Sequence, residues 1–217
     1  AVDLVGGIRR YVTRGATVTV KPNIGWNSTP ELHANTHPVV VRTVVAMCFE
    51  AGASKVYVFD RSVNNSELTY VTSGIQAAAR EAGATVEQAR RIDNSWYKSV
   101  KVPGGTYLKE SLVFKRVLEC DALINVPVAK HHSSSGLTMG MKNMMGVTGD
   151  DRSRWHWQLH DAISDINLAV KSSLTVIDAT WIMKSGGPTG GSLSFLERKD
   201  MVIASSNVVW ADAEATS

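Results

Sequence analysis

The sequence predicts an α/β fold: a mostly parallel sheet with helices on both faces, arranged in Rossmann-like layers. Short apolar, β-branched runs alternate with helical patterns along the chain, and this alternation is typical of parallel strands connected by helices. The chain has 217 residues, of which 44% are hydrophobic and 20% charged, as in ordinary globular proteins. We therefore expect residues 1–217 to form one domain.

The first half of the chain contains a strand–helix–strand unit. The elements expected here are a helix over 3–14, a strand over 16–20, a helix over 39–51, a strand over 55–59, a helix over 64–83 and a strand over 84–86. The expected C-terminal stops of these helices are Gly15, Gly52 and Gly83. Pro38 occupies the favoured first helical position, with Thr36 or His37 as the N-cap. Residues 16–60 thus predict a βαβ unit with a right-handed crossover.

The second half continues the alternation. The elements expected here are a hairpin near 98–102 with a turn at 103–105, a strand over 122–126, a helix over 152–172, strands over 174–177 and 201–204, and a helix from 207. Residues 110–117 suit either a strand or the start of a helix. Because a domain rarely stops at the beginning of a helix, and the chain starts without Met, we expect a longer natural protein whose C-terminal part is missing here.

Composition excludes several classes of protein. The net charge is only +3, without a run of lysines and arginines, so a nucleic-acid surface is not indicated. No apolar run approaches the ~18–20 residues of a membrane span, and no signal peptide is visible. Cys48 and Cys120 lie in separate apolar runs and are expected to be buried thiols, and an iron–sulfur cluster cannot be built from this chain alone. The sequence does not decide between a cytoplasmic protein and one that is exported after cleavage of a leader.

Polar residues follow the predicted strands, and in such sheets ligands bind beyond the carboxyl ends of the strands. These strand-end residues are Lys21, Asn23, Asp60, the segment 125–132 and Asp178. Trp26 and Trp181 stand in the same strand-end loops as candidate walls of a pocket. Either aspartate could instead cap the helix or turn that follows it.

The stretch over 123–149, LINVPVAKHHSSSGLTMGMKNMMGVTG, is the most site-like part of the sequence. It begins as an apolar strand and is expected to continue as a glycine-rich loop. Lys130 and Lys142 in this loop, together with Lys21, could bind a phosphate or carboxylate, although lysines are more often simply solvated. Neither GxxxxGK[ST] nor a GxGxxG after a strand is present, so the standard nucleotide motifs do not apply.

His156 and His160 are four residues apart on the predicted helix and share one of its faces. An HxxxH pair can hold a divalent metal, but the glutamate of an HExxH motif is missing. His160 could also be oriented by Asp161 or Asp165 as an acid/base group. The alternative is a polar cluster on the helix surface.

Several motifs together resemble the DUF362 family. They are the run over 130–146, Val-Lys-Pro-Asn at 20–23, Thr-His-Pro at 36–38, Glu-Ala-Gly-Ala at 50–53 with the strand to Asp60, His160 with Ile163 and Asp165, Val-Ile-Asp at 176–178, Gly-Pro at 187–188, and Ala204 with Ala211-Asp212. The resemblance covers nearly the whole chain. It implies that His132, rather than His131, is the family's histidine, because the family more usually has a small hydroxyl residue at the position of His131.

The family is named for having no assigned function. Many members carry ferredoxin-type cysteine runs, which this chain lacks, so the resemblance implies a ferredoxin-type or other redox partner rather than an internal cluster. Some relatives are exported by the twin-arginine route, but Arg9-Arg10 inside a predicted helix is no such signal.

Taken together, the sequence predicts a protein that binds a small anionic molecule at the strand ends. The expected ligand-binding residues are Lys21, Asn23, Thr36, Asp60, Thr138, Lys142, Asn143 and Asp178, and the expected catalytic residues are His132, Lys130, His160 and Asp165. A redox or metal-assisted enzyme is the preferred class, with His132 and His160 as candidate ligands of a divalent metal, while the cofactor itself stays unspecified. The alternatives are a non-catalytic metal- or ligand-binding protein and a structural subunit of a larger assembly.

Overall fold

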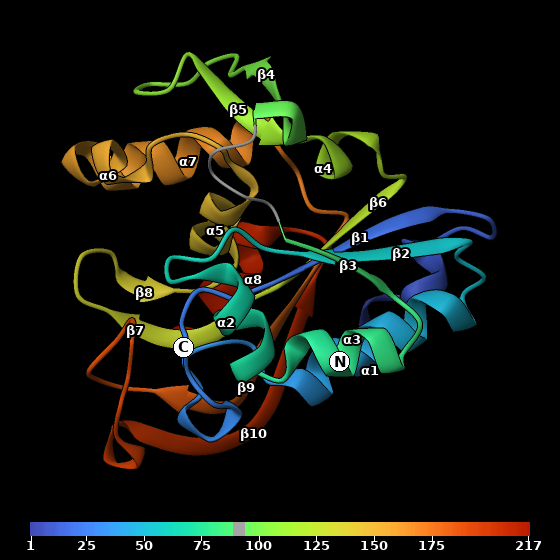
Figure 1. The fold of residues 1–217 in the computed structure, drawn as a ribbon, viewed down its shortest axis with the longest axis horizontal. Coiled ribbons are helices and arrows are strands. Elements are labelled where there is room, and N and C mark those ends of the chain that lie inside the picture. Colours follow the sequence, from blue (N-terminus) through green and yellow to red (C-terminus); the bar gives the residue numbers. More distant parts are fainter. Residues whose placement is uncertain (89–93) are drawn as a thin grey trace.

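A computed structural model describes residues 1–88 and 94–217 and confirms the α/β class (Figure 1). The strands of the main sheet are β1 (Thr17–Pro22), β2 (Lys55–Phe59), β3 (Thr85–Glu87), β6 (Ala122–Val126), β7 (Val128–His132), β8 (Gly136–Thr138), β9 (Leu174–Met183) and β10 (Leu196–Ser205). Their order is β3-β2-β1-β6-β9-β7-β8, with β10 added to β9. The pairs that β1, β2, β3, β6, β7 and β9 make with one another are parallel, whereas β8 and β10 run antiparallel to their partners.

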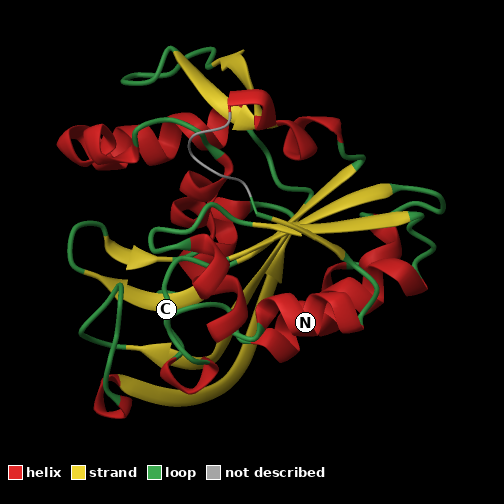
Figure 2. Cartoon of the chain, viewed as in Figure 1, coloured by secondary structure: helices red, strands yellow, loops and turns green. Residues whose placement is uncertain are grey.

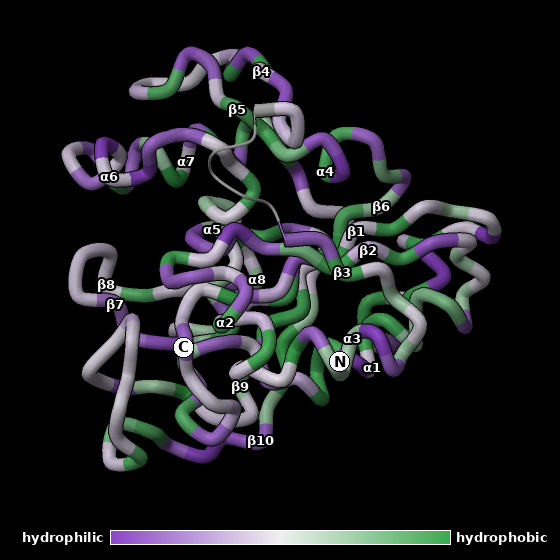
Figure 3. The backbone as a smooth tube through the Cα atoms, in the orientation of Figure 1, coloured by the Kyte–Doolittle hydropathy of each residue, from purple (hydrophilic) through white to green (hydrophobic). Residues whose placement is uncertain are grey.

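Helices cover both faces of this sheet (Figure 2). The helices are α1 (Pro38–Glu50), α2 (Ser66–Thr72), α3 (Ile75–Glu81), α4 (Lys115–Glu119), α5 (Gly140–Asn143), α6 (Arg152–Trp155), α7 (Leu159–Ala169) and α8 (Val208–Glu214). One core cluster joins α1, α2 and α3 to β1, β2 and β6, and another joins α7 to the separate hairpin of β4 (Tyr97–Lys101) and β5 (Glu110–Phe114). In Figure 3 hydrophobic stretches gather where the strands converge, whereas α6 is mostly hydrophilic.

Strands β6 and β7 follow one another across Pro127, and both pair with β9. The first part of β9 pairs with β6, at Ile124 with Leu174, and its last part pairs with β7, at Val128 with Asp178. The strand predicted over 174–177 therefore continues to Met183, and Asp178 lies within β9 rather than at its end.

Glycines break two of the predicted helices. Residues 3–14 form two short 3-10 helices, η1 (Val2–Val5) and η2 (Ile8–Arg10), instead of one α-helix, because Gly6 and Gly7 adopt positive φ values of 101° and 75°. The helix predicted over 64–83 is divided into α2 and α3 by Gly74, with a φ of 71°. Both predicted helices ran through a glycine that leaves the helical conformation.

Three further segments differ from the expectation. The helix over 152–172 is interrupted between α6 and α7 by a 3-10 turn, η6 (His156–Gln158), whose last residue has a φ of −139°. The segment over 110–117, left open between strand and helix, is both, since β5 passes directly into α4. The loop expected after residue 126 is instead the β7–β8 hairpin followed by α5 and the 3-10 helix η5 (Met144–Val147).

The remaining short helices are η3 (Pro30–Leu32), η4 (Asn94–Trp96) and η7 (Leu193–Phe195). Over the described ranges, every helix is too short or too polar to traverse a lipid bilayer.

Candidate functional site

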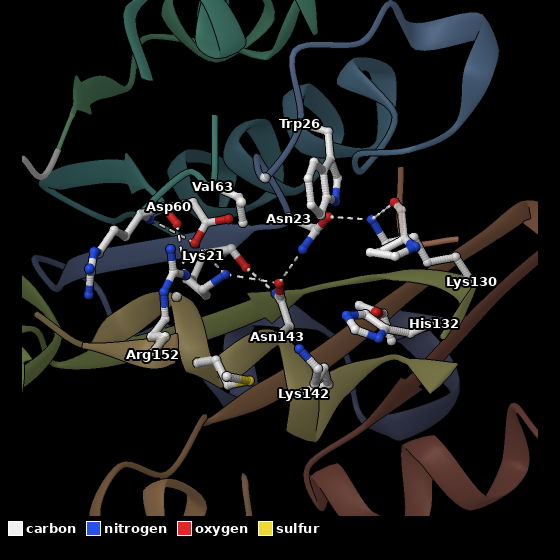
Figure 4. Close-up of a pocket in the computed structure, with 16 residues that line it drawn as sticks. Lys21, Asn23, Trp26, Asp60, Val63, Lys130, His132, Lys142, Asn143 and Arg152 are labelled. Atoms are coloured by element: carbon white, nitrogen blue, oxygen red, sulfur yellow. Dashed lines mark hydrogen bonds and ion pairs between the residues drawn. The ribbon is translucent and has the colours of Figure 1, made fainter. Parts of the chain in front are cut away.

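The strand-end residues of β1 and β2 meet in a buried ion pair. Lys21, at the end of β1, has no solvent exposure, and its Nζ lies 2.7 Å from Oδ1 of Asp60, just after β2 (Figure 4). The same Nζ donates to Oδ1 of Asn143 and to the carbonyl of Pro22, both at 2.9 Å. Burial lowers the pKa of Lys21, but these acceptors match the three N–H groups of an ammonium ion and hold it in place.

Asp60 is fully engaged by the surrounding chain. Its Oδ1 also accepts from the backbone N–H of Arg61 at 2.8 Å, and its Oδ2 accepts from that of Ile24 at 2.7 Å. A side chain on Gly146 would overlap both the Asp60 carboxylate and the Lys21 amine, so only glycine fits there. Asp60 therefore serves as the counter-ion of Lys21.

Amide side chains connect this ion pair to the neighbouring strands. Oδ1 of Asn143, on α5, accepts from Nδ2 of Asn23 at 3.1 Å, and its Nδ2 donates to Oδ1 of Asn125 at 2.8 Å. Asn143 also donates to the carbonyl of Lys21 at 3.1 Å. The network fixes α5, and with it the adjacent Lys142, against the ends of β1 and β6.

Lys130, on β7, is a second buried lysine. Its Nζ donates to the carbonyls of Ala34 and Pro188 and to Oδ1 of Asn23, at 3.0 Å for Pro188 and 3.2 Å for Asn23. The ring of Trp26 lies 5.9 Å from this Nζ. Burial, reinforced by the charge of Lys142, lowers the pKa of Lys130 to about 7. Three acceptors again match the donors of the charged form.

His132, at the end of β7, is held as a neutral hydrogen-bond donor. Its Nδ1 accepts from the backbone N–H groups of Ser134 and Ser135, at 3.1 and 3.4 Å. The proton of the neutral ring must then sit on Nε2. Burial and the nearby lysines lower the pKa of His132 to about 4, so the ring is uncharged at neutral pH.

Lys142 and Thr138 provide two donors that the protein leaves open. The Lys142 ammonium, on α5, makes no ion pair or hydrogen bond with residues 1–88 or 94–217, and burial lowers its pKa to about 8. Within the same ranges, the hydroxyl of Thr138, at the end of β8, is buried and has no partner. The two residues and His132 come from three different elements and line one cavity.

That cavity has a volume of about 70 Å³ and opens into a larger cleft of about 790 Å³. The small inner cavity is lined by Lys21, Asn23, Gly25, Trp26, Asp60, Arg61, Val63, Lys130, His132, Thr138, Lys142, Asn143, Met145, Gly146, Arg152 and Pro188. The outer cleft shares Trp26, Arg61, Val63, His132, Lys142, Met145, Arg152 and Pro188 with it and adds the residues 62, 64–67, 133, 134, 151, 153 and 156. Figure 4 shows the labelled side chains of the inner cavity converging from opposite sides.

Two arginines of the site were not predicted from the sequence. Arg61 donates to the carbonyls of Thr148 and Asp150 at 2.6 and 2.7 Å, and Arg152 donates to the carbonyls of Arg61 and Ser62 at 3.0 and 3.1 Å. The position of Arg61, directly after the strand-end aspartate, was the available signal.

Four predicted site residues lie outside both of these cavities: Thr36, His160, Asp165 and Asp178. Asp165 accepts from the backbone N–H groups of residues 106, 107 and 108 at 2.7–2.8 Å and anchors the β4–β5 loop on α7. Asp178 accepts from the N–H of His37 at 2.8 Å, next to the start of α1. Thr36 bridges the N–H of Asn23 and the carbonyl of Val126.

His160 is exposed on α7, whereas His132 lies in the cleft, so the structure does not bring these two candidate metal ligands into one cavity. Across the described parts of the chain, no group of three or more His, Cys, Asp or Glu side chains could hold a metal ion. Both cysteines are free, and burial raises the pKa of Cys48 to about 12.

Comparisons with known proteins agree with the fold. A thylakoid-associated protein of Synechocystis sp. is 25% identical over 204 residues, which cover 88% of this chain and 60% of that protein. The lactate racemase apoprotein of Thermoanaerobacterium thermosaccharolyticum superposes with a TM-score of 0.57 at 10% identity, over 99% of this chain and 52% of that one. The chain thus spans little more than half the length of these two proteins. The profile of the family described as "Domain of unknown function (DUF362)" matches residues 18–217, and the chain therefore belongs to the DUF362 family.

Proposed function

We propose that the cleft binds an anionic small molecule and that Lys142, His132 and Thr138 hold its anionic group in the inner cavity. The observation that carries this proposal is the half-buried ammonium of Lys142, which has no acceptor among the residues that the structure describes. A charge in such a position is costly unless a partner offsets it. A bound anion would supply that partner.

The electrostatics of the cavity favour the same ligand. Among the described residues that line it are five basic side chains and one carboxylate, and the oxygens of that carboxylate, on Asp60, already accept from Lys21 and two backbone amides. Lys21 and Lys130 are held rigidly by their own acceptors and raise the potential without moving. Walls of low dielectric concentrate this positive field in the cavity.

The state of His132 defines what the site could do chemically. Because its Nδ1 is occupied by two backbone N–H groups, the ring presents an N–H at Nε2 and does not act as a base through that atom. A fixed, uncharged donor stabilises negative charge on a bound group. The same contacts would serve a non-catalytic binding protein, which is the alternative that the sequence left open.

The proposal is tested by calorimetric titration of the 217-residue chain at pH 7 with inorganic phosphate and with lactate. Lactate is included because the structural neighbour is named a lactate racemase. Lys142→Met should weaken binding at least about tenfold, as expected for the loss of a hydrogen bond to a charged group. Lys171→Met, which changes an exposed lysine outside both cavities, is the matched control and should bind as the wild type does. Failure of both anions to bind, or equal binding by Lys142→Met, would contradict the proposal.

A further inference from the structure

We infer that the anion is the phosphate of an organic phosphate monoester, with the phosphate in the inner cavity and a hydroxyl-rich body in the outer cleft. This inference rests on the proposed anion site and specifies the class of molecule that it takes. Three independent features support it: the sizes of the two cavities, the charge and donors of the inner one, and the lining of the outer one.

The two volumes fit a small head group and a larger body. At about 70 Å³ the inner cavity is many times smaller than the outer cleft. A single phosphoryl or carboxyl group fills such a space. The outer cleft of about 790 Å³ is in the range of sites for whole organic molecules, and a three-carbon acid would leave most of it empty.

Charge and donor number favour a phosphate over a carboxylate. Among the described residues, five basic side chains and one carboxylate line the inner cavity. A dianion offsets more of this net positive charge than a monoanion does. The open donors are the ammonium of Lys142, the Nε2–H of His132 and the hydroxyl of Thr138. They come from α5, β7 and β8, and three donors on three elements match the three terminal oxygens of a phosphate monoester.

The outer cleft is lined by groups that bind hydroxyls. One wall carries the hydroxyl and amide side chains of residues 62 and 64–66, and the turn of the β7–β8 hairpin adds Ser133 and Ser134. The ring of Trp26 also lines this cleft and offers a flat apolar surface. A sugar or a ribonucleoside has the hydroxyls and the flat face that this lining requires.

Calorimetric titration with five probes tests the inference: ribose 5-phosphate, adenosine 5′-monophosphate, inorganic phosphate, ribose and lactate. At least one of the two phosphate monoesters should bind about tenfold or more tightly than inorganic phosphate and lactate, and ribose should bind weakest of all. The ratio between the two monoesters tells a sugar phosphate from a nucleotide, and either order supports the inference. Lactate or inorganic phosphate binding as tightly as both monoesters would overturn it.

A variant that narrows the outer cleft tests the position of the organic body separately from that of the phosphate. Ser133 is exposed and lines the outer cleft but not the inner cavity. Ser133→Trp should weaken the better monoester about tenfold and leave inorganic phosphate unchanged, whereas unchanged monoester binding would place the body elsewhere and overturn the inference. If phosphate and lactate bind through Lys142 but the monoesters gain nothing, this inference fails while the proposed function stands. If no anion binds, both fail.

Discussion

Replacement of Lys142 with methionine should stabilise the fold while it removes the contact to the anion. Burial lowers the pKa of this lysine from 10.5 to about 8, and each pKa unit corresponds to about 1.36 kcal/mol. The charged side chain therefore costs the folded state about 3 kcal/mol at neutral pH. Methionine keeps most of the aliphatic stem, so little packing is lost and most of this cost should be recovered.

The gain should depend on pH with a definite sign. Between about pH 8 and pH 10.5 the folded chain binds fewer protons at Lys142 than the unfolded chain does, so wild-type stability rises with pH in this window. The cost is complete below pH 8 and absent above pH 10.5. The advantage of Lys142→Met is thus about 3 kcal/mol at pH 7 and less than about 1 kcal/mol at pH 10.

Urea denaturation of the wild type, Lys142→Met and the control Lys171→Met at pH 7 and pH 10 measures both quantities. The control should differ little from the wild type at either pH, because surface substitutions usually change stability by less than about 0.5 kcal/mol. The reasoning is refuted if Lys142→Met is less stable than the wild type at pH 7, or if its advantage is equal at both pH values. Either result would mean that the Lys142 ammonium has a partner or is well solvated.

Three further results are expected. Anion affinity, measured by calorimetry from pH 6.5 to 9.5, should fall as the pH rises through about 8, because deprotonated Lys142 carries no charge, and a flat profile would argue against its role. The imidazole ¹⁵N NMR signals of His132 should show a neutral ring with its proton on Nε2 down to about pH 5, and protonation near pH 6.5 would contradict the assigned donor role. Asp165→Ala should lower the free energy of unfolding by about 3–5 kcal/mol, since three backbone amides lose their acceptor, while the folded variant keeps its anion affinity; a selective loss of affinity would return Asp165 to the site.

The strands were predictable because buried strands are rich in apolar and β-branched residues. The central residues of β1, β2 and β6 are mostly apolar and β-branched. Polar residues follow β2, the last strand of the βαβ unit, as expected. The β7–β8 hairpin was not predictable, because its sequence from Lys130 to Thr138 looks like a solvated loop. Its side chains Lys130, His132 and Thr138 face an internal cavity rather than solvent, and local periodicity does not distinguish the two environments.

Part of the candidate site followed from one rule, and the rest depends on contacts between distant segments. The rule that parallel strands end at the same edge brings Lys21, Asn23 and Asp60 together with residues 130–143. The rule does not tell which carboxylates already accept hydrogen bonds from backbone N–H groups. Asp165 and Asp178 looked like ligand-binding groups. However, they accept hydrogen bonds from backbone N–H groups that lie 57 and 141 residues away in the sequence, and no local pattern shows such contacts.

The lysines of the cleft therefore divide into two kinds that mutation can separate. Lys21→Met would leave the buried Asp60 without its counter-ion and should destabilise the fold by about 3–5 kcal/mol, the usual result of breaking a buried pair from one side. Lys142→Met, which changes the residue next to Asn143 on α5, should do the reverse. Stability changes of opposite sign in urea denaturation at pH 7 would show that Lys21 serves the fold, whereas Lys142 is available for a ligand. If both variants lose stability, Lys142 belongs to the scaffold, and the anion must be sought among the arginines of the outer cleft.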